Sequence, residues 1–366
     1  MEKDIRIIDV NMKENERISC EDISWHLPYE APFRLSGFAF FEEDRIYRRL
    51  PGKKRELFEQ VNPNLNMLSE NTAGGQIAFR TNASRILLKV SLKGIHNMVN
   101  MTAVGQCGFD CYLGQRGERY KFYGITRFDI SRKEYLCEVV SGLPEHEIRE
   151  VLLNFPLYEG VDQVLIGLDQ NAGILEPQPY EDAKKIVFYG TSITQGGCAS
   201  RPGLAYPNIL SRWLNRECIN LGFSANGLGE PEMAEVIAEM EDLSLVVLDY
   251  EANSATNGRL FASLNNFIEI IRRKQPQIPI LVLSRVQYLP DCYDKKLMDN
   301  RESYRNFQKT VVLERRKAGD ENLHFLNGND LWDESFDEYT VDGIHPTDLG
   351  FWKMAEGLLP VLQGLL

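Results

Sequence analysis

The chain contains 366 residues, of which 43% are hydrophobic and 26% are charged, proportions that are ordinary for globular proteins. Its formal net charge of −12 argues against a nucleic-acid partner, because such partners are bound by basic patches that displace counterions. No apolar stretch approaches the roughly 20 residues needed to cross a bilayer, so we expect no membrane partner.

The N-terminus and the cysteines indicate in which cellular compartment the protein is expected. Met1-Glu2-Lys3-Asp4-Ile5 lacks the basic start and apolar core of a signal peptide, which favours a cytoplasmic location; a trimmed export signal is the alternative. The seven cysteines are an odd number without C-x-x-C spacing, so we expect reduced and mostly buried thiols. Four of the five histidines are isolated from one another, and we expect neither a metal nor another cofactor.

Residues 1–172 are predicted to form an N-terminal all-β sandwich of jelly-roll-like type. Short β-like runs alternate there with Gly, Asn and charged turns, and no helical periodicity of useful length intervenes. The expected strands are Leu35–Phe41, Gly75–Thr81, Ile86–Leu92, Cys107–Leu113, Tyr120–Tyr123, Tyr135–Val140, Ile148–Asn154 and Val164–Leu168.

Residues 173–182 are predicted to be a linker. This stretch contains Pro177 and Pro179 and shows no periodicity. It separates two segments of ordinary domain size, each long enough to bury its own core.

Residues 183–366 alternate between apolar strands and amphipathic helices, which predicts a parallel sheet with helices on both faces. The expected strands are 186–190, 218–222, 243–250, 279–286 and 323–327. The expected helices are 205–217, 231–241, 259–274, 300–318 and 349–363. In such three-layer sheets ligands bind outside the carboxyl ends of the strands.

A serine follows the first of these strands. Ser192 lies in Tyr189-Gly190-Thr191-Ser192-Ile193-Thr194, where a buried strand gives way to a helix. That position suits a nucleophile, because the strand holds it rigidly and helix-start N–H groups lie beside it. The alternative is a simple N-cap, for which Ser and Thr are also preferred.

A histidine with a nearby carboxylate lies about 150 residues further on. The stretch reads Asp342-Gly343-Ile344-His345-Pro346, and the Asp342 carboxylate can reach His345 Nδ1 across a single turn of chain. A general base needs such a group to fix its tautomer and stabilise the imidazolium. The alternative is a polar loop preceding a helix that Asp348 caps.

Two further strand ends could supply an oxyanion hole. The strand 218–222 runs into the turn Phe223-Ser224-Ala225-Asn226-Gly227, and the strand 243–250 runs into Glu251-Ala252-Asn253-Ser254. A backbone N–H from the first turn and the amide of Asn253 are the kinds of donor that stabilise a tetrahedral oxyanion.

These four blocks, in this order, resemble those of the SGNH hydrolases, also called the GDSL esterase and lipase superfamily. The resemblance covers roughly residues 183–366 and retains the serine, the asparagine and the Asp-x-x-His-Pro block. It departs from the family pattern at Thr191, where the family has Asp, at Ala225, where it has Gly, and at Glu251, where it also has Gly. Gly108-Phe109-Asp110-Cys111-Tyr112 resembles the Gly-x-Asp-Leu-Tyr signature of a β-domain that precedes one branch of these esterases.

The resemblance implies a serine esterase with the triad Ser192, His345 and Asp342. The backbone N–H groups of Ser192 and Ala225, with the side chain of Asn253, would form the oxyanion hole. The implied substrate is an O-acyl ester, acetyl in particular, on a small molecule or an oligosaccharide. The loop Gly196–Tyr206 could present Arg201 and Tyr206 to the leaving alcohol.

Two alternatives remain open at this stage. Thr191, Ala225 and Glu251 motivate an inactive carbohydrate-binding protein. Transfer of the acyl group to a sugar would use the same residues and differ only in the exclusion of water. The sequence does not indicate the oligomeric state.

Overall fold

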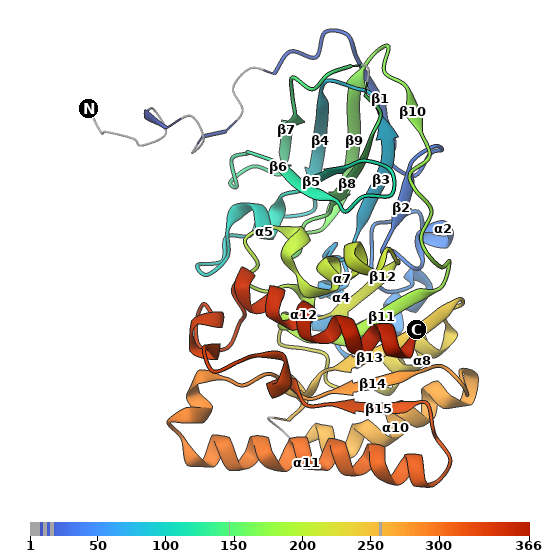
Figure 1. The fold of residues 1–366 in the computed structure, drawn as a ribbon, viewed down its shortest axis with the longest axis vertical. Helices are drawn as coiled ribbons and strands as arrows, with labels where there is room; N and C mark the ends of the chain where they lie inside the picture. The colour runs from blue at the N-terminus through green and yellow to red at the C-terminus, as the bar shows by residue number, and fades with distance from the viewer. Residues whose placement is uncertain (1–7, 10–12, 15–17, 146, 256–257) are drawn as a thin grey trace.

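The computed structural model describes residues 8–9, 13–14, 18–145, 147–255 and 258–366. Figure 1 shows two units along the long axis, a β-sandwich and below it a parallel sheet flanked by helices. The residues considered for an export signal, 1–5, lie outside the described ranges. None of the described helices is long and apolar enough to cross a membrane.

The β-sandwich consists of two antiparallel sheets, as predicted. The first has the order β1 (Ile23–His26), β9 (Val161–Asp169), β4 (Ile86–Leu92), β7 (Glu134–Val140). The second has the order β10 (Ile174–Leu175), β3 (Gln76–Thr81), β8 (Arg149–Asn154), β5 (Asp110–Gly114), β6 (Lys121–Ile125), with β2 (Arg34–Ser36) also pairing with β3. Alternate residues such as Ile77, Phe79 and Leu88 fill the core between the sheets.

The N-terminal half also contains short helices, which the sequence did not predict. These are α2 (Phe41–Asp44), a 3₁₀ turn (Gly52–Lys54), α3 (Arg55–Val61), α4 (Pro63–Leu68) and α5 (Ala103–Cys107). The longest, α3, has seven residues, too few for a 3.6-residue period to be legible. Phe58 and Leu65 of α3 and α4 join the core of the α/β unit, so the N-terminal half packs into its neighbour.

The segment 173–182, predicted as a linker, lies against the β-sandwich. It contains β10, which pairs with β3. The Arg34 guanidinium lies 3.8 Å from the centre of the Tyr180 ring, and the Tyr180 hydroxyl donates to Ser36 Oγ at 2.9 Å.

The α/β unit has a five-stranded parallel sheet, as predicted. Its order is β12 (Cys218–Gly222), β11 (Lys185–Gly190), β13 (Leu243–Asp249), β14 (Ile280–Leu283), β15 (Leu323–Leu326). One face is covered by α7 (Tyr206–Leu214) and α12 (Asp348–Leu365). The other is covered by α8 (Pro231–Glu239), α10 (Arg259–Lys274) and α11 (Lys295–Lys317). Both faces are apolar, which is why the strands read as continuous hydrophobic runs.

Strand β12 is the edge of this sheet nearest the β-sandwich (Figure 1). The buried Arg49 reaches it from the N-terminal half: its guanidinium donates to the Gly222 carbonyl and, at 3.4 Å, to the Asn220 carbonyl. The same side chain donates to the carbonyls of Asn71 and Leu68 at 2.9 and 2.7 Å. Arg49 thereby links the N-terminal half to the strand that ends in the predicted oxyanion turn.

Candidate active site

Ser192 opens the short helix α6 (Ser192–Gln195) at the carboxyl end of β11. Thr191 is the N-cap, and a capping box joins it to Thr194, whose hydroxyl accepts from the Thr191 N–H at 3.3 Å. A side chain at Gly190 would overlap Thr194 Oγ1, so the strand must end in glycine for the turn to close. The Ser192 residue is 8% exposed, held within the protein but open to one side.

His345 meets Ser192 across 153 residues of sequence. Ser192 Oγ lies 2.9 Å from His345 Nε2, and His345 Nδ1 lies 2.8 Å from Asp342 Oδ2. The loop is closed by a bridge between Thr340 and Pro346, which directs the imidazole toward the serine. The three predicted triad residues therefore form one continuous hydrogen-bonded chain.

The Asp342 carboxylate is fixed by its own loop. Its Oδ1 accepts from the backbone N–H groups of His345 at 2.8 Å and Ile344 at 3.1 Å. Burial acts to raise the pKa of Asp342, but these hydrogen bonds and the His345 ring outweigh it, and the pKa lies below its ordinary value. The carboxylate is thus ionised wherever the histidine could act as a base.

Asn100, from the N-terminal half, also contacts this carboxylate. Its Nδ2 donates to Asp342 Oδ2 at 3.2 Å. Sequence reasoning missed this residue, and no local motif around Asn100 marks it. The N-terminal domain therefore supplies a residue to the candidate site.

The two predicted oxyanion segments lie together at the same sheet edge. Asn253, in the short helix α9 (Glu251–Ser254), donates through Nδ2 to the Asn226 carbonyl at 2.6 Å. Ala225, the residue before Asn226, is exposed and adopts φ +54°. The left-handed conformation accounts for glycine at this position in the family pattern, and Ala225 tolerates it at some cost in free energy.

Glu251, the third departure from the family pattern, is the buried first residue of α9, and its side chain ties the helix in place. Its Oε2 accepts from the Arg285 N–H at 2.9 Å and from Gln308 Nε2 at 2.7 Å. Burial raises the pKa of Glu251, and the Arg285 side chain opposes that rise. This substitution therefore anchors the helix that carries Asn253 and leaves the asparagine in position.

Arg201 and Tyr206, the predicted contacts to the leaving alcohol, point elsewhere. The Tyr206 side chain is fully buried, and its hydroxyl donates to Asp249 Oδ2 at 2.9 Å. The Arg201 guanidinium donates to Asp110 Oδ2 at 2.9 Å and lies 3.8 Å from the centre of the Phe122 ring. Both side chains are held by carboxylates of the protein, Tyr206 in the interior and Arg201 with its side chain partly exposed.

The aspartate of the Gly-x-Asp-Leu-Tyr-like segment holds the loop that follows α6. Asp110 is fully buried; its Oδ2 accepts from the Gly203 N–H at 2.8 Å and from Arg201 Nη1. Its Oδ1 accepts from Asn154 Nδ2 at 2.7 Å. The signature thus has a physical role, because it joins the β-sandwich to the loop beside the nucleophile.

Cys198 lies close to the triad. Its sulfur, the Asp342 carboxylate and a His345 ring nitrogen lie within 4.8 Å of one another, a group compatible in size with a metal ion. Burial first, and the Asp342 charge second, raise the pKa of Cys198 to about 12. Such a pKa keeps the free thiol protonated at neutral pH.

A cavity of about 340 Å³ opens beside the turn that carries Ala225. We call it the Ala225 cavity. Apart from Ser224, Ala225 and Asn226, its lining comes from the N-terminal half: Asn64, Met67, Leu68, Asn71, His96, Met98 and Tyr158. The N-terminal half thus forms most of the wall of this cavity.

Comparisons with known proteins agree with this geometry. A model of the GDSL-like lipase/acylhydrolase family matches residues 183–363, and a model of the N-terminus of SGNH-hydrolase-type esterases matches residues 23–174. A protein of Bacteroides ovatus ATCC 8483 described as a GDSL-like lipase is 31% identical, with 94% of this chain and 98% of that chain covered and a TM-score of 0.84. No curated protein is detectably similar in sequence.

More distant structures share the fold. The salicylyl-acyltransferase SsfX3 from a tetracycline biosynthetic pathway is 20% identical, covering 94% of this chain and 98% of that chain, with a TM-score of 0.76. A family two carbohydrate esterase from Clostridium thermocellum, in complex with cellohexaose, is 16% identical, covering 80% and 94%, with a TM-score of 0.56. The two family models and the Bacteroides protein together show that the chain belongs to the GDSL-like lipase/acylhydrolase family and is a carboxylic ester hydrolase.

Proposed function

We propose that this protein hydrolyses O-acyl esters of a carbohydrate, acetyl esters in particular, through a covalent acyl-serine. The observation that carries the proposal is the assembled relay, with 2.9 Å between Ser192 Oγ and His345 Nε2 and 2.8 Å between His345 Nδ1 and Asp342 Oδ2. The carbohydrate part is supported by the fold shared with an esterase solved in complex with cellohexaose.

In the first half-reaction Ser192 Oγ attacks the ester carbonyl while His345 Nε2 takes the hydroxyl proton. Asp342 holds the imidazole in the tautomer with the proton on Nδ1 and stabilises the imidazolium. When the tetrahedral intermediate collapses, the C–O bond to the alcohol breaks and His345 protonates the departing oxygen. Water then attacks the acyl-serine with His345 again acting as base, releasing the carboxylic acid and regenerating Ser192.

The oxyanion would be held by the N–H groups of Ser192 and Ala225 and by the Asn253 amide. Asn253 Nδ2 carries two hydrogens, and only one is needed for the bond to the Asn226 carbonyl. That bond fixes the orientation of the amide, so its second hydrogen is pre-set for the substrate. The neighbouring Ala225 cavity would receive one of the two substituents of the ester carbonyl.

The test is turnover of p-nitrophenyl acetate by the whole protein and by Ser192→Ala. We expect the variant to lose at least a thousandfold in kcat, because the nucleophile is removed. Ser131→Ala, an exposed serine of the N-terminal half, is the matched control and should match the wild type. Unchanged turnover in Ser192→Ala would exclude the acyl-serine mechanism and favour a protein that only binds carbohydrate.

The substrate and the acceptor need separate experiments. Acetylated xylo-, manno- and cello-oligosaccharides, assayed for acetate release, test the carbohydrate assignment; activity on p-nitrophenyl acetate without release from any of them would contradict it. Mass spectrometry with an added acceptor sugar separates hydrolysis from transfer, since only transfer adds the acyl mass to the acceptor.

A further inference from the structure

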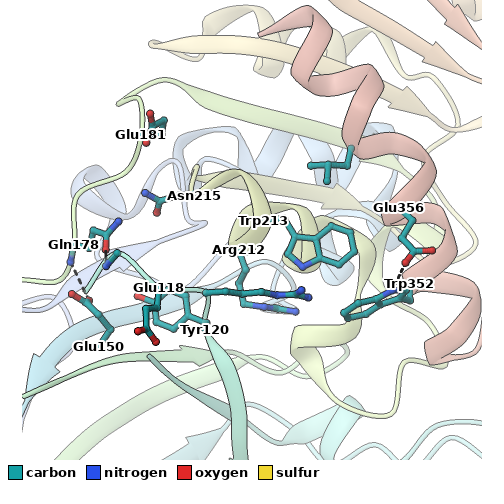
Figure 2. A pocket seen from close by; sticks show the side chains of 13 residues that line it. Glu118, Tyr120, Glu150, Gln178, Glu181, Arg212, Trp213, Asn215, Trp352 and Glu356 are labelled. Atoms are coloured by element: carbon teal, nitrogen blue, oxygen red, sulfur yellow. Dashed lines mark hydrogen bonds between the residues drawn. The ribbon is translucent and has the colours of Figure 1, made fainter. Parts of the chain in front are cut away.

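We infer that a second site, away from the catalytic centre, binds an unesterified carbohydrate chain. The site is a groove of about 630 Å³ where the N-terminal half meets helices α7 and α12 (Figure 2). We call it the tryptophan groove, and its principal residues are Tyr120, Glu150, Gln178, Trp213, Asn215 and Trp352. The inference goes beyond the proposed ester hydrolysis, because binding in this groove requires no ester.

The tryptophan groove is separated from the triad by the length of α7. The helix begins at Tyr206, which contacts Asp249 at the catalytic end of β13. Trp213 is seven residues further on, roughly 10 Å along the axis at 1.5 Å per residue. Neither the triad nor the oxyanion residues line the groove. A ligand there would leave the ester site free.

One wall of the groove is aromatic. Trp213 and Trp352 are half-buried and pack edge to face, with ring centres 4.8 Å apart and an interplanar angle of 83°. The Trp352 indole N–H donates to Glu356 Oε1 at 2.8 Å, which fixes that ring (Figure 2). The Arg119 guanidinium lies 5.4 and 5.5 Å from the two ring centres. These contacts hold two large rings in fixed orientations at the surface. Exposing such apolar rings to water is unfavourable, so a ligand that covers them would be stabilised.

The opposite wall carries side-chain amides that are held in fixed orientations and keep one polar atom available for a ligand. Asn215 Nδ2 donates to the Pro179 carbonyl at 3.0 Å, and Gln178 Oε1 accepts from the Gly117 N–H at 2.7 Å. Each bond fixes an amide, yet Asn215 Oδ1 and Gln178 Nε2 have no hydrogen-bond partner among the residues that the structure describes. The groove therefore presents at least one fixed acceptor and one fixed donor.

Glu150 supports this wall from beneath. The residue is 2% exposed; its Oε2 accepts from the Gln178 N–H at 3.1 Å, as Figure 2 shows. Its Oε1 lies 3.6 Å from Arg80 Nε, and the Tyr120 side chain also interacts with the Glu150 carboxyl group. Glu150 therefore orders the backbone of Gln178 and the Tyr120 side chain, and the amides of Asn215 and Gln178 are the groups open to a ligand.

This combination matches the chemistry of a sugar ring. A pyranose has apolar C–H faces that pack on an indole, and equatorial hydroxyls that both donate and accept hydrogen bonds. A strongly charged ligand would instead require one prevailing sign of charge, whereas Glu118, Glu181 and Glu356 line the groove together with Arg119 and Arg212. Carbohydrate is therefore the ligand class that fits.

The experiment measures binding of unacetylated cellohexaose, xylohexaose and mannohexaose to the whole protein by isothermal titration calorimetry. We expect at least one of them to bind, and Trp213→Ala to weaken that binding at least tenfold. Turnover of p-nitrophenyl acetate by Trp213→Ala should stay within twofold of the wild type. Tyr123→Ala, an exposed aromatic residue on β6 outside the groove, should bind as the wild type does.

Further variants guard against misfolding and against binding at the catalytic centre. Trp213→Phe keeps an aromatic face and should retain most of the affinity, and Gln178→Ala removes a donor without touching the core. Ser192→Ala should leave oligosaccharide binding unchanged. Failure of all three oligosaccharides to bind, or binding that survives both Trp213→Ala and Gln178→Ala, would overturn the inference. Failure of the proposed esterase function would be seen in the turnover assay alone.

Discussion

Asp249 places an enclosed carboxyl group directly beneath the nucleophile turn. It lies at the carboxyl end of β13, and its Oδ2 accepts hydrogen bonds from Thr194 Oγ1 and from the Tyr206 hydroxyl, both at 2.9 Å. Burial raises the pKa of Asp249 to about 7, and the two hydrogen bonds only partly oppose this rise. The residue titrates near neutral pH although it does not contact the reacting atoms.

A pH dependence of stability follows from this pKa. The ordinary pKa of aspartate, about 3.9, applies to the unfolded chain. Between about pH 4 and 7 the folded protein holds one proton more than the unfolded chain, so the free energy of unfolding falls as the pH rises. Asp249→Asn removes this contribution, and its stability relative to the wild type should increase from pH 5 to pH 7. Urea unfolding at pH 5, 6, 7 and 8 measures this difference; parallel curves for the two proteins would contradict it.

Asn100 is the other residue whose role can be measured separately. Its amide donates to Asp342 Oδ2, the oxygen that also faces His345 Nδ1. One hydrogen bond contributes about 0.5–1.5 kcal/mol, so Asn100→Ala should lower kcat roughly two- to twelvefold with little change in KM. Asn100→Asp would set a second carboxylate beside Asp342 and should cost more. Equal kcat values for wild type and both variants would show that Asp342 needs no support from the N-terminal half.

At the scale of elements, the active site is built from turns that follow strands. The turn after β11 is closed by the Thr191–Thr194 capping box, and the turn after β12 requires a positive φ at Ala225. The departures from the family pattern at Thr191, Ala225 and Glu251 each have a local physical account. None of them removes a group that the proposed mechanism uses.

Ala225→Gly tests the strain in the second turn. The left-handed region costs a non-glycine residue about 1–2 kcal/mol, while glycine adds roughly 0.4–1 kcal/mol of unfolded-chain entropy. We expect a net gain of about 0.5–1 kcal/mol in the free energy of unfolding, with kcat within twofold because the backbone N–H remains. Ala255→Gly, at φ −66°, is the matched control and should lose stability. A loss of similar size in both variants would show that Ala225 is not strained.

At the scale of the whole molecule, the two halves act as one structure around the site. Phe58 and Leu65 pack into the α/β core, Arg49 bonds to β12, and Asp110 holds the loop beside α6. The Ala225 cavity and the tryptophan groove are both lined by residues from either side of the junction. The N-terminal domain therefore contributes to the candidate active site, through Asn100 and the Ala225 cavity, and to the separate tryptophan groove.

Asp110→Ala measures the strength of this junction. The change leaves the Arg201 guanidinium without its carboxylate and the Gly203 N–H without an acceptor. Removing one partner of such a buried ion pair costs about 3–5 kcal/mol. We expect a fall of that size in urea unfolding, together with a loss of turnover as the loop beside α6 shifts. Asp162→Ala, an exposed aspartate on β9, should differ from the wild type by less than about 0.5 kcal/mol.

The sequence by itself determined the elements and the chemistry that depend on short stretches of chain. Strands such as 218–222 and helices such as 259–274 were predicted at their observed bounds, because buried parallel strands and amphipathic helices carry clear periodic patterns. Ser192, Asp342 and His345 were identifiable for the same reason, since each lies in a local motif at a strand end or helix start.

Only the tertiary structure decided which remote side chains meet. Arg201 and Tyr206 belong to the loop that was expected to present them to the leaving alcohol, yet their polar groups bond to distant partners, Asp110 and Asp249. Asn100 reaches Asp342 across 242 residues of chain, and the tryptophan groove joins segments from both halves. Such contacts arise from the packing of one domain on another. Local periodicity fixes backbone conformation and burial, but it contains no information about which remote surface will complete a site.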